Sequence, residues 1–360
     1  MASLTPRPSG RGAVSNASGR FESEARVEFD DGWEANETPP PLRTTLTAET
    51  ARTIITRNDS PDVSFDQSIN PYRGCEHGCI YCYARPAHAF IGLSPGLDFE
   101  SRLFFKPRAA ELLEKELSKP GYQPKVIHIG GNTDPYQPVE RRTEITRGLI
   151  EVLGRFRHPF SIITKSALIC RDIDLLAPMA EAGLVRAAVS VTTLDRGLAR
   201  TMEPRAATPE RRLEAIRRLA AAGIPTTVMF APVIPGLNDH ELESILQRAA
   251  EAGAVGAGYV ALRLPLEIKT LFEQWLETAA PDRARRVMSL VRQMRGGETY
   301  DSTWGQRMRG QGPIAELLAK RFAMGKRRLG LDQGPPPLDT SQFKVPQRPS
   351  EQVDLFVNPP

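Results

Sequence analysis

Three of the four cysteines in this 360-residue chain lie within eight positions, at Cys75, Cys79 and Cys82. A C-x3-C-x2-C spacing can bring three thiolates together on one metal centre, and Gly74 and Gly78 relax the backbone around them. So few cysteines, so unevenly placed, do not make a disulfide framework. They are typical of a metal site in a reducing compartment, and we therefore expect a cytoplasmic protein.

Two kinds of metal centre suit three cysteines. A structural zinc ion needs a fourth ligand, for which His77 or His88 is available nearby in the sequence. An iron–sulfur cube with three cysteine ligands keeps one iron open, and an open iron can take part in chemistry. The fourth cysteine, Cys170, lies far along the chain, and we interpret it as a buried small hydrophobic residue.

Short apolar runs alternate with amphipathic stretches through the middle of the chain. The pattern predicts strands at 68–73, 125–130, 160–165, 184–191, 225–230 and 257–262, and helices at 143–156, 172–182, 208–223 and 239–252. Such an alternation is typical of βαβ units, in which helices cover a parallel sheet. It predicts an α/β fold with about six βα units, and it leaves both a partial barrel and a doubly wound sheet open.

The arrangement of Cys75, Cys79, Tyr81 and Cys82 resembles the signature of the radical S-adenosylmethionine (radical SAM) family. In that family, C-x3-C-x-aromatic-C follows the first strand of an incomplete (β/α)6 barrel of the TIM type. The resemblance covers about residues 65–265. It implies that the three thiolates hold a 4Fe–4S cluster that binds S-adenosylmethionine. The bound cofactor would then be cleaved to a 5′-deoxyadenosyl radical that abstracts hydrogen from a substrate. An electron donor such as flavodoxin or ferredoxin is implied as a partner.

The resemblance also places cofactor contacts at the ends of successive strands. Tyr81 would lie against the adenine, and Lys165 would meet the carboxylate of the cofactor. The other contacts that the resemblance implies are polar or backbone groups after later strands: Gly130, Gly131, Asn132, Thr133, Asp134, Ser190, Thr192 and Val233.

Three segments, 79–85, 132–136 and 164–166, look like the spore photoproduct lyase branch of DNA-repair-like proteins within that family. This likeness assigns Tyr83 and Lys165 as residues that serve the cofactor or the substrate. The lyases carry a hydrogen-donating cysteine after the second strand, where this chain has Gly131. We therefore expect a related but different radical reaction, or another hydrogen donor such as Tyr83 or Tyr136.

Charge is concentrated near the C-terminal end. Residues 281–332 hold 12 Lys and Arg against 5 Asp and Glu, a net charge of +7 on a chain whose total is +4. A basic segment of this kind suits a polyanion such as DNA, and it equally suits a solvated helical surface. Further on, the segment Gln352–Phe356 resembles the short peptide by which bacterial proteins bind the replication sliding clamp.

Composition divides the chain into four parts. We expect residues 1–60 to be a mostly disordered extension and residues 61–280 to form the radical SAM core. Residues 281–332 should form a basic helical extension, and 333–360 a disordered Pro-rich tail. No apolar run is long enough for a membrane span, and the N-terminus has no apolar signal segment. Three functions remain open: a radical enzyme acting on nucleic acid, one acting on a small molecule or protein, and a non-enzymatic zinc-bearing nucleic-acid-binding protein.

Overall fold

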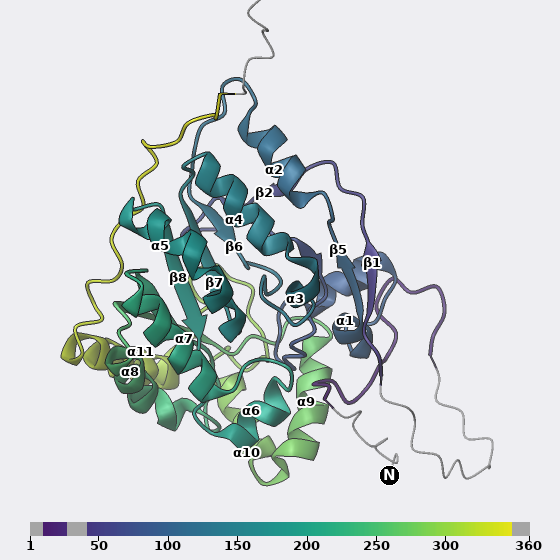
Figure 1. Ribbon diagram of the computed structural model, residues 1–360. Helices are drawn as coiled ribbons and strands as arrows, with labels where there is room; N and C mark the ends of the chain where they lie inside the picture. Colours follow the sequence, from purple (N-terminus) through teal and green to yellow (C-terminus); the bar gives the residue numbers. More distant parts are fainter. Residues whose placement is uncertain (1–9, 27–41, 348–360) are drawn as a thin grey trace, which may run out of the picture.

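The computed structural model describes residues 10–26 and 42–347, and its centre is a seven-stranded sheet (Figure 1). The strand order is β10-β9-β8-β7-β6-β3-β2, in which β3 to β10 run parallel and β2 is antiparallel to β3. Six parallel strands in one open sheet confirm the incomplete (β/α)6 barrel. The strands are β2 (Ile55–Arg57), β3 (Gln67–Ile69), β6 (Ile127–Ile129), β7 (Phe160–Thr164), β8 (Val185–Ser190), β9 (Thr226–Val233) and β10 (Gly256–Ala261).

Helices follow the parallel strands and pack against the sheet, as the alternation predicts (Figure 1). The first turn of α7 shows why such helices can be predicted: the Thr208 side chain accepts a hydrogen bond from the Arg211 N–H, and Pro209 occupies the first turn. The helices that follow β6 to β9 are α3 (Glu140–Thr143), α4 (Ile145–Arg155), α5 (Ile173–Glu181), α6 (Arg196–Met202), α7 (Pro209–Ala221) and α8 (Leu242–Glu251), with 3-10 turns η2 (Ala167–Asp172) and η3 (Asp239–Glu241).

The predicted strand 68–73 is two strands that belong to different sheets. β3 ends at Ile69, whereas β4 (Tyr72–Arg73) pairs with β5 (Arg102–Phe105), which β1 (Thr45–Ala48) joins on its other side. Pro71 lies between β3 and β4, and because it has no N–H to donate, it interrupts the strand. The cysteine segment therefore leaves from β4. It is followed by η1 (Arg85–Ile91), α1 (Leu97–Ser101) and α2 (Ala109–Leu117) before the chain returns to the sheet at β6.

The N-terminal part differs from the predicted disordered extension 1–60 wherever the structure describes it. Residues 11–14 are buried, and the N–H groups of Gly12 and Ala13 each donate to the Glu100 carboxylate at 2.8 Å. Strands β1 and β2 also fall within this range. Hydropathy patterns do not reveal these contacts, because they are made by backbone groups and by the Arg11 side chain, which donates to the Glu100 carbonyl.

The C-terminal extension 281–332 contains two helices, and residues 294–311 and 329–332 lie outside them. It contains α10 (Pro281–Gln293) and α11 (Gly312–Arg328), and it follows α9 (Ile268–Ala279). Helices α9 and α10 contribute to a second hydrophobic cluster beside the cysteine segment. Helix α11 packs on α8, where Arg321 pairs with Glu243 at 2.6 Å.

Residues 333–347 follow the surface of the fold, which differs from the predicted disordered tail. The Phe343 ring lies 5.4 Å from the Tyr122 ring, and Gln342 donates to the Ala182 carbonyl at 2.7 Å. Figure 1 shows this yellow segment running past α5 toward α2. The clamp-like segment Gln352–Phe356 lies outside the described residues. In the two described ranges, no helix is long and apolar enough to cross a membrane.

Candidate active site

The cysteine segment is held by backbone hydrogen bonds to two distant parts of the chain. The N–H of Cys75 donates to the Phe99 carbonyl at 2.9 Å, and the N–H of Ile80 donates to the Met202 carbonyl at 3.0 Å. Cys75 and Cys79 are buried, Cys82 is partly buried, and all three are free thiols. The segment is therefore fixed in place by the fold before any ligand binds.

A buried ion pair supports the turn between the first two cysteines. Arg85 is fully buried, pairs with Glu100, and donates to the carbonyls of Gly78 at 3.2 Å and Cys79 at 2.9 Å. Gly78 has a φ of +69°, and a Cβ there would lie 2.6 Å from the Glu100 carboxylate. The turn thus requires glycine, and one buried arginine neutralises the carboxylate beside it.

The three thiols lie close enough to influence one another. Burial raises the pKa of Cys75, and negative charge on Asp134, Cys79 and Cys82 raises it further. Burial also raises the pKa of Cys79, to about 12, although the Lys165 ammonium opposes this. Thiols crowded in this way are stabilised as thiolates by a positive centre, which is the chemistry of a metal ligand set.

The histidines that could complete a zinc site have other partners. His77 Nδ1 lies 3.3 Å from the Asp134 carboxylate, and His88 Nε2 lies 2.9 Å from the Arg102 carbonyl oxygen. Within residues 10–26 and 42–347, no three His, Cys, Asp or Glu side chains are grouped to hold a single metal ion. In an iron–sulfur cluster each cysteine binds its own iron, so three sulfur donors on one loop fit such a cluster.

A network around Glu203 lies directly against Cys79. Glu203 Oε2 is 3.9 Å from the Cys79 sulfur and accepts a hydrogen bond from the Tyr81 hydroxyl. The other oxygen, Oε1, accepts from the Thr192 hydroxyl and pairs with Arg212 at 2.6 Å. Burial alone would raise the pKa of Glu203, but the Arg212 and Lys165 charges outweigh it and lower the pKa. We call Tyr81, Thr192, Glu203 and Arg212 the Glu203 network.

Lys165 reaches the same place from the end of β7. Its ammonium nitrogen lies 5.8 Å from the centre of the Tyr81 ring. Burial would lower the pKa of Lys165, but the Cys79 and Glu203 charges raise it, so the side chain is a cation at neutral pH. The structure thus brings together Tyr81, Thr192 and Lys165, which the sequence assigned to the cofactor.

The loop after β6 is tied to its neighbours by Asp134. The carboxylate accepts from the Thr164 hydroxyl at 2.6 Å and from the Lys165 N–H at 2.8 Å. Burial would raise the pKa of Asp134, but His77 and these hydrogen bonds lower it to about 2. Asp134 therefore positions the ends of β6 and β7 relative to the cysteine segment.

The other predicted residues of this loop mostly shape it. Gly130 has a φ of +96°, and a Cβ there would lie 2.5 Å from the Ile163 carbonyl oxygen. The Asn132 N–H donates to the Asn70 side chain at 2.9 Å, and the Thr133 hydroxyl donates to the Tyr72 carbonyl at 3.0 Å. These contacts join the loop to β3 and β4.

The two tyrosines considered as hydrogen donors lie in different surroundings. Tyr83 is 47% exposed, its hydroxyl donates to the Gly131 carbonyl, and the Arg263 guanidinium lies 4.6 Å above its ring. Tyr136 is fully buried, and its hydroxyl donates to Asp172 at 3.0 Å. Only Tyr83 of the two is therefore accessible to a bound molecule.

The remaining predicted residues lie at strand ends. The Ser190 carbonyl accepts from Arg212 at 3.2 Å, and the buried Val233 accepts from the Leu262 N–H at 2.9 Å. Cys170 is buried in the main hydrophobic core, as expected. Glu203, Arg212 and Arg85 were not predicted, because a charged residue in a helical or loop stretch is usually on the surface.

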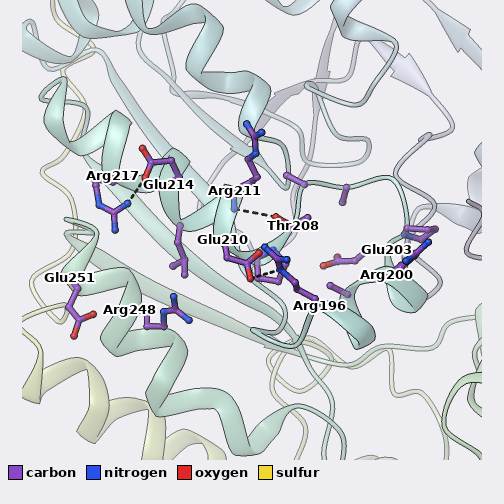
Figure 2. Close-up of a pocket in the computed structure, with 16 residues that line it drawn as sticks. Arg196, Arg200, Glu203, Thr208, Glu210, Arg211, Glu214, Arg217, Arg248 and Glu251 are labelled. Carbon is purple, nitrogen blue, oxygen red and sulfur yellow. Dashed lines mark hydrogen bonds and ion pairs between the residues drawn. The ribbon is translucent and has the colours of Figure 1, made fainter.

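A pocket of about 870 Å³ is lined by Glu203 and by residues of α6, α7 and α8 (Figure 2). Its lining includes the ion pairs Arg196–Glu210 and Arg217–Glu214. Arg248, which also lines it, makes no ion pair within the part of the chain that the structure describes. None of the three clustered cysteines lines this pocket, so it is a separate surface feature.

Comparison with known proteins identifies the family of this arrangement. The family model described as "Radical SAM superfamily" matches residues 69–249. An uncharacterized protein of Mycobacterium tuberculosis is 36% identical over 284 residues, which are 78% of this chain and 80% of that protein. An uncharacterized protein of Methanocaldococcus jannaschii is 28% identical over 173 residues, 48% of this chain and 62% of that protein.

Solved structures show a shared fold at low sequence identity. A mutant of spore photoproduct lyase aligns with a TM-score of 0.56 and 16% identity over 79% of this chain and 80% of that chain. Spore photoproduct lyase complexed with dinucleoside spore photoproduct aligns with a TM-score of 0.54 and 16% identity over 79% of each chain.

Proposed function

The chain belongs to the radical SAM superfamily of enzymes, and on this premise we propose that it binds a 4Fe–4S cluster through Cys75, Cys79 and Cys82 and uses S-adenosylmethionine to abstract hydrogen from a nucleic acid. Membership in an enzyme family also makes the third possibility, a non-enzymatic zinc-bearing protein, wrong. The observation that carries the proposal is the position of the three thiols against Tyr81, Glu203 and Lys165.

A cluster with one open iron supplies a site for the amino and carboxylate groups of S-adenosylmethionine and the electron that cleaves its sulfonium bond. The residues of this chain would hold and orient the cofactor. The Lys165 ammonium is a cation over the Tyr81 ring whose charge also acts on Cys79, which suits the methionine carboxylate. The Glu203 network fixes the Tyr81 hydroxyl from behind, so the ring keeps one orientation.

Water exclusion is the second task of the protein. Glu203 and Arg212 are buried beneath the site with their charges paired, so the wall behind Cys79 is closed to solvent. A closed wall suits radical chemistry, since a reactive intermediate must meet only its substrate. Tyr83 is the exposed member of the site and would face the substrate.

Two observations support a nucleic acid as the substrate. The chain shares its fold with spore photoproduct lyase, whose solved structure binds a dinucleoside photoproduct. The C-terminal extension is basic. Gly131 stands in the loop after β6, and Cys170 is buried in the core, so neither supplies a thiol beside Tyr83. We therefore propose a reaction that ends differently from that of the lyase.

The experiment uses the full-length protein, reconstituted with iron and sulfide without oxygen, reduced with dithionite as the electron source, and supplied with S-adenosylmethionine that carries tritium at C5′. Irradiated and unirradiated DNA are offered in parallel with a no-DNA sample. We expect DNA to accelerate the formation of 5′-deoxyadenosine and label to enter one of the DNA samples. The Cys170→Ala variant serves as the control and should behave like the wild type.

Two outcomes would contradict the proposal at different levels. If iron-loaded protein cleaves no S-adenosylmethionine, the cofactor assignment fails. If cleavage proceeds equally with and without DNA and no label leaves the cofactor, the nucleic-acid substrate fails, and a small-molecule or protein substrate takes its place.

A further inference from the structure

Two segments meet across the open side of the barrel. Loop 58–66 joins β2 to β3 at one free edge of the sheet, and segment 296–310 follows α10. The Asp62 carboxylate in the loop accepts a hydrogen bond from the Gly305 N–H at 2.6 Å and forms an ion pair with Arg307. Arg307 also donates to the Ser60 hydroxyl. The opening between the two edges of the sheet is therefore bridged by side-chain contacts.

Segment 296–310 is attached to the end of β10, on the other free edge. The Met308 carbonyl accepts the N–H of Ala261 at 2.9 Å. Arg295 is buried and donates to the carbonyls of Leu262 at 2.7 Å and Gln306 at 2.9 Å. Because the carboxyl ends of parallel strands share one rim, this attachment places the segment on the same rim as the active site.

Arg263 connects this segment to Tyr83. Its guanidinium lies 4.6 Å above the Tyr83 ring, and its Nη1 is 3.5 Å from the Met308 sulfur. On the loop side, Phe65 stacks on His128 at 4.2 Å, and a Cβ on Gly131 would lie 3.4 Å from the Phe65 ring. Both bridging segments thus reach the surroundings of Tyr83.

Segment 296–310 carries an exposed aromatic ring and an exposed cation. Trp304 is 57% exposed. Arg309 lies 3.8 Å above the Tyr259 ring, and neither Arg309 nor Arg263 forms an ion pair with any acid of the described residues. We call Tyr83, Arg263, Trp304 and Arg309 the seam surface.

We propose that the seam surface binds a single strand of nucleic acid, with one base stacked on Trp304 and phosphates held by Arg263 and Arg309. Exposed aromatic rings flanked by unpaired cations are the elements that single-stranded nucleic acids bind, because each base has a face to stack and each link carries a negative charge. An unpaired strand is required, since the bases of a duplex are stacked on one another. A strand bound there places a neighbouring nucleotide at Tyr83.

This inference rests on the proposed nucleic-acid substrate, and it names the surface that would bind it. The test is the anisotropy of a fluorescein-labelled oligothymidylate titrated with the full-length protein at low salt. Stacking one base contributes about 1–3 kcal/mol, so Trp304→Ala should weaken binding roughly 5- to 150-fold. Trp304→Phe keeps a ring and should bind within about threefold of the wild type.

The matched control is Leu317→Ala, because Leu317 on α11 is also 57% exposed and lies outside the seam surface. It should bind like the wild type. Since Trp304 is exposed, the thermal unfolding midpoint of Trp304→Ala should stay close to that of the wild type, which separates lost binding from lost folding.

The outcomes distinguish the two proposals. If the wild type binds the oligonucleotide and Trp304→Ala binds it equally well, the seam surface is wrong and the nucleic-acid substrate stands. If the wild type binds a duplex of the same length more tightly than the single strand, the single-strand assignment is wrong. If it binds neither at low salt, both proposals fail.

Discussion

The Glu203 network and the seam surface lie on the same rim of the sheet and differ in how far their charges are paired. In the Glu203 network each carboxylate oxygen has a hydroxyl or guanidinium partner, and Glu203 and Arg212 are buried. In the seam surface, Arg263 and Arg309 form no contact ion pair within the described ranges, although the Arg263 charge acts on Asp62, and Trp304 is exposed. A charged group that already has hydrogen-bond and ion-pair partners keeps its geometry, whereas a charged group without them is stabilised when it binds a ligand. This difference fits the two proposals, in which the Glu203 network supports the cofactor and the seam surface is completed by a bound substrate.

The largest expected effect tests the cofactor side. Cys75→Ala, Cys79→Ala and Cys82→Ala should each lose the iron content of the reconstituted protein and the release of 5′-deoxyadenosine, because each removes one of the three sulfur donors. Iron per chain is measured with a colorimetric assay after anaerobic reconstitution. Cys170→Ala, in the core, should keep both. Full iron loading in any of the three variants would show that the substituted cysteine is not a ligand of the cluster.

The second effect concerns the support of the cysteine turn. Arg85→Ala leaves Glu100 buried without its cationic partner, and such a loss costs about 3–5 kcal/mol of unfolding free energy. Urea unfolding of the apoprotein measures it. The control is Arg217→Ala, whose partner Glu214 is about half exposed, and it should cost at most about 1 kcal/mol. Equal losses of unfolding free energy in the two variants would mean that the buried pair Arg85–Glu100 stabilises the protein no more than an exposed ion pair does.

The third prediction concerns the dependence of stability on pH, through His128, which stacks on Phe65 of loop 58–66. Burial, followed by the charge of Arg186, lowers the pKa of His128 from 6.5 to about 4. The unfolded chain therefore binds a proton between these values that the folded chain does not. Stability should fall as the pH drops from 6.5 toward 4, by up to about 3 kcal/mol.

The measurement is the unfolding midpoint in urea at successive pH values. His128→Gln should make this part of the profile shallower without flattening it, because burial also lowers the pKa of His158 to about 4 and that residue still titrates. The exposed His240→Gln is the control and should leave it unchanged. A profile that His128→Gln does not alter would show that Phe65 and its loop do not shield His128.

The smallest effect separates the seam surface from basic charge in general. Arg309→Ala should lower the slope of log affinity against log salt by about 1, as expected for one lost phosphate contact. Arg248→Ala is the matched control, because Arg248 is also exposed and has no ion pair among the described residues, yet it lines the pocket of Figure 2 and is not part of the seam surface. Equal slopes for the two variants would indicate diffuse binding to the basic surface.

The sequence was informative where the signal is local. Thr208 and Pro209 predict the start of a helix, and the alternation of apolar runs predicts about six βα units; the structure contains both. Three cysteines within eight positions predict a metal site, and this stays a prediction. The family resemblance assigned Tyr81, Thr192 and Lys165 to the cofactor, and the structure places the three side chains around Glu203.

The rest depended on contacts between distant charged residues. Tyr81 and Glu203 are 122 positions apart, and Glu203 reads as an ordinary polar residue until its partners are known. The same holds for Arg85 and Glu100, and for Gly12 and Ala13, whose backbone groups carry no side-chain pattern. Pro71 was visible in the sequence, but its effect of dividing one strand between two sheets appears only when β4 pairs with β5.

The Gly12 and Ala13 contacts with Glu100 have a consequence for biosynthesis. The leading residues emerge from the ribosome long before Glu100 exists to receive them, and Arg212 is translated later still. The surroundings of the cysteine segment are thus assembled from parts of the chain that are translated at different times. A nascent chain that has not yet been extended past Arg212 lacks these walls, so we predict that any loading with iron and sulfide follows translation of the barrel.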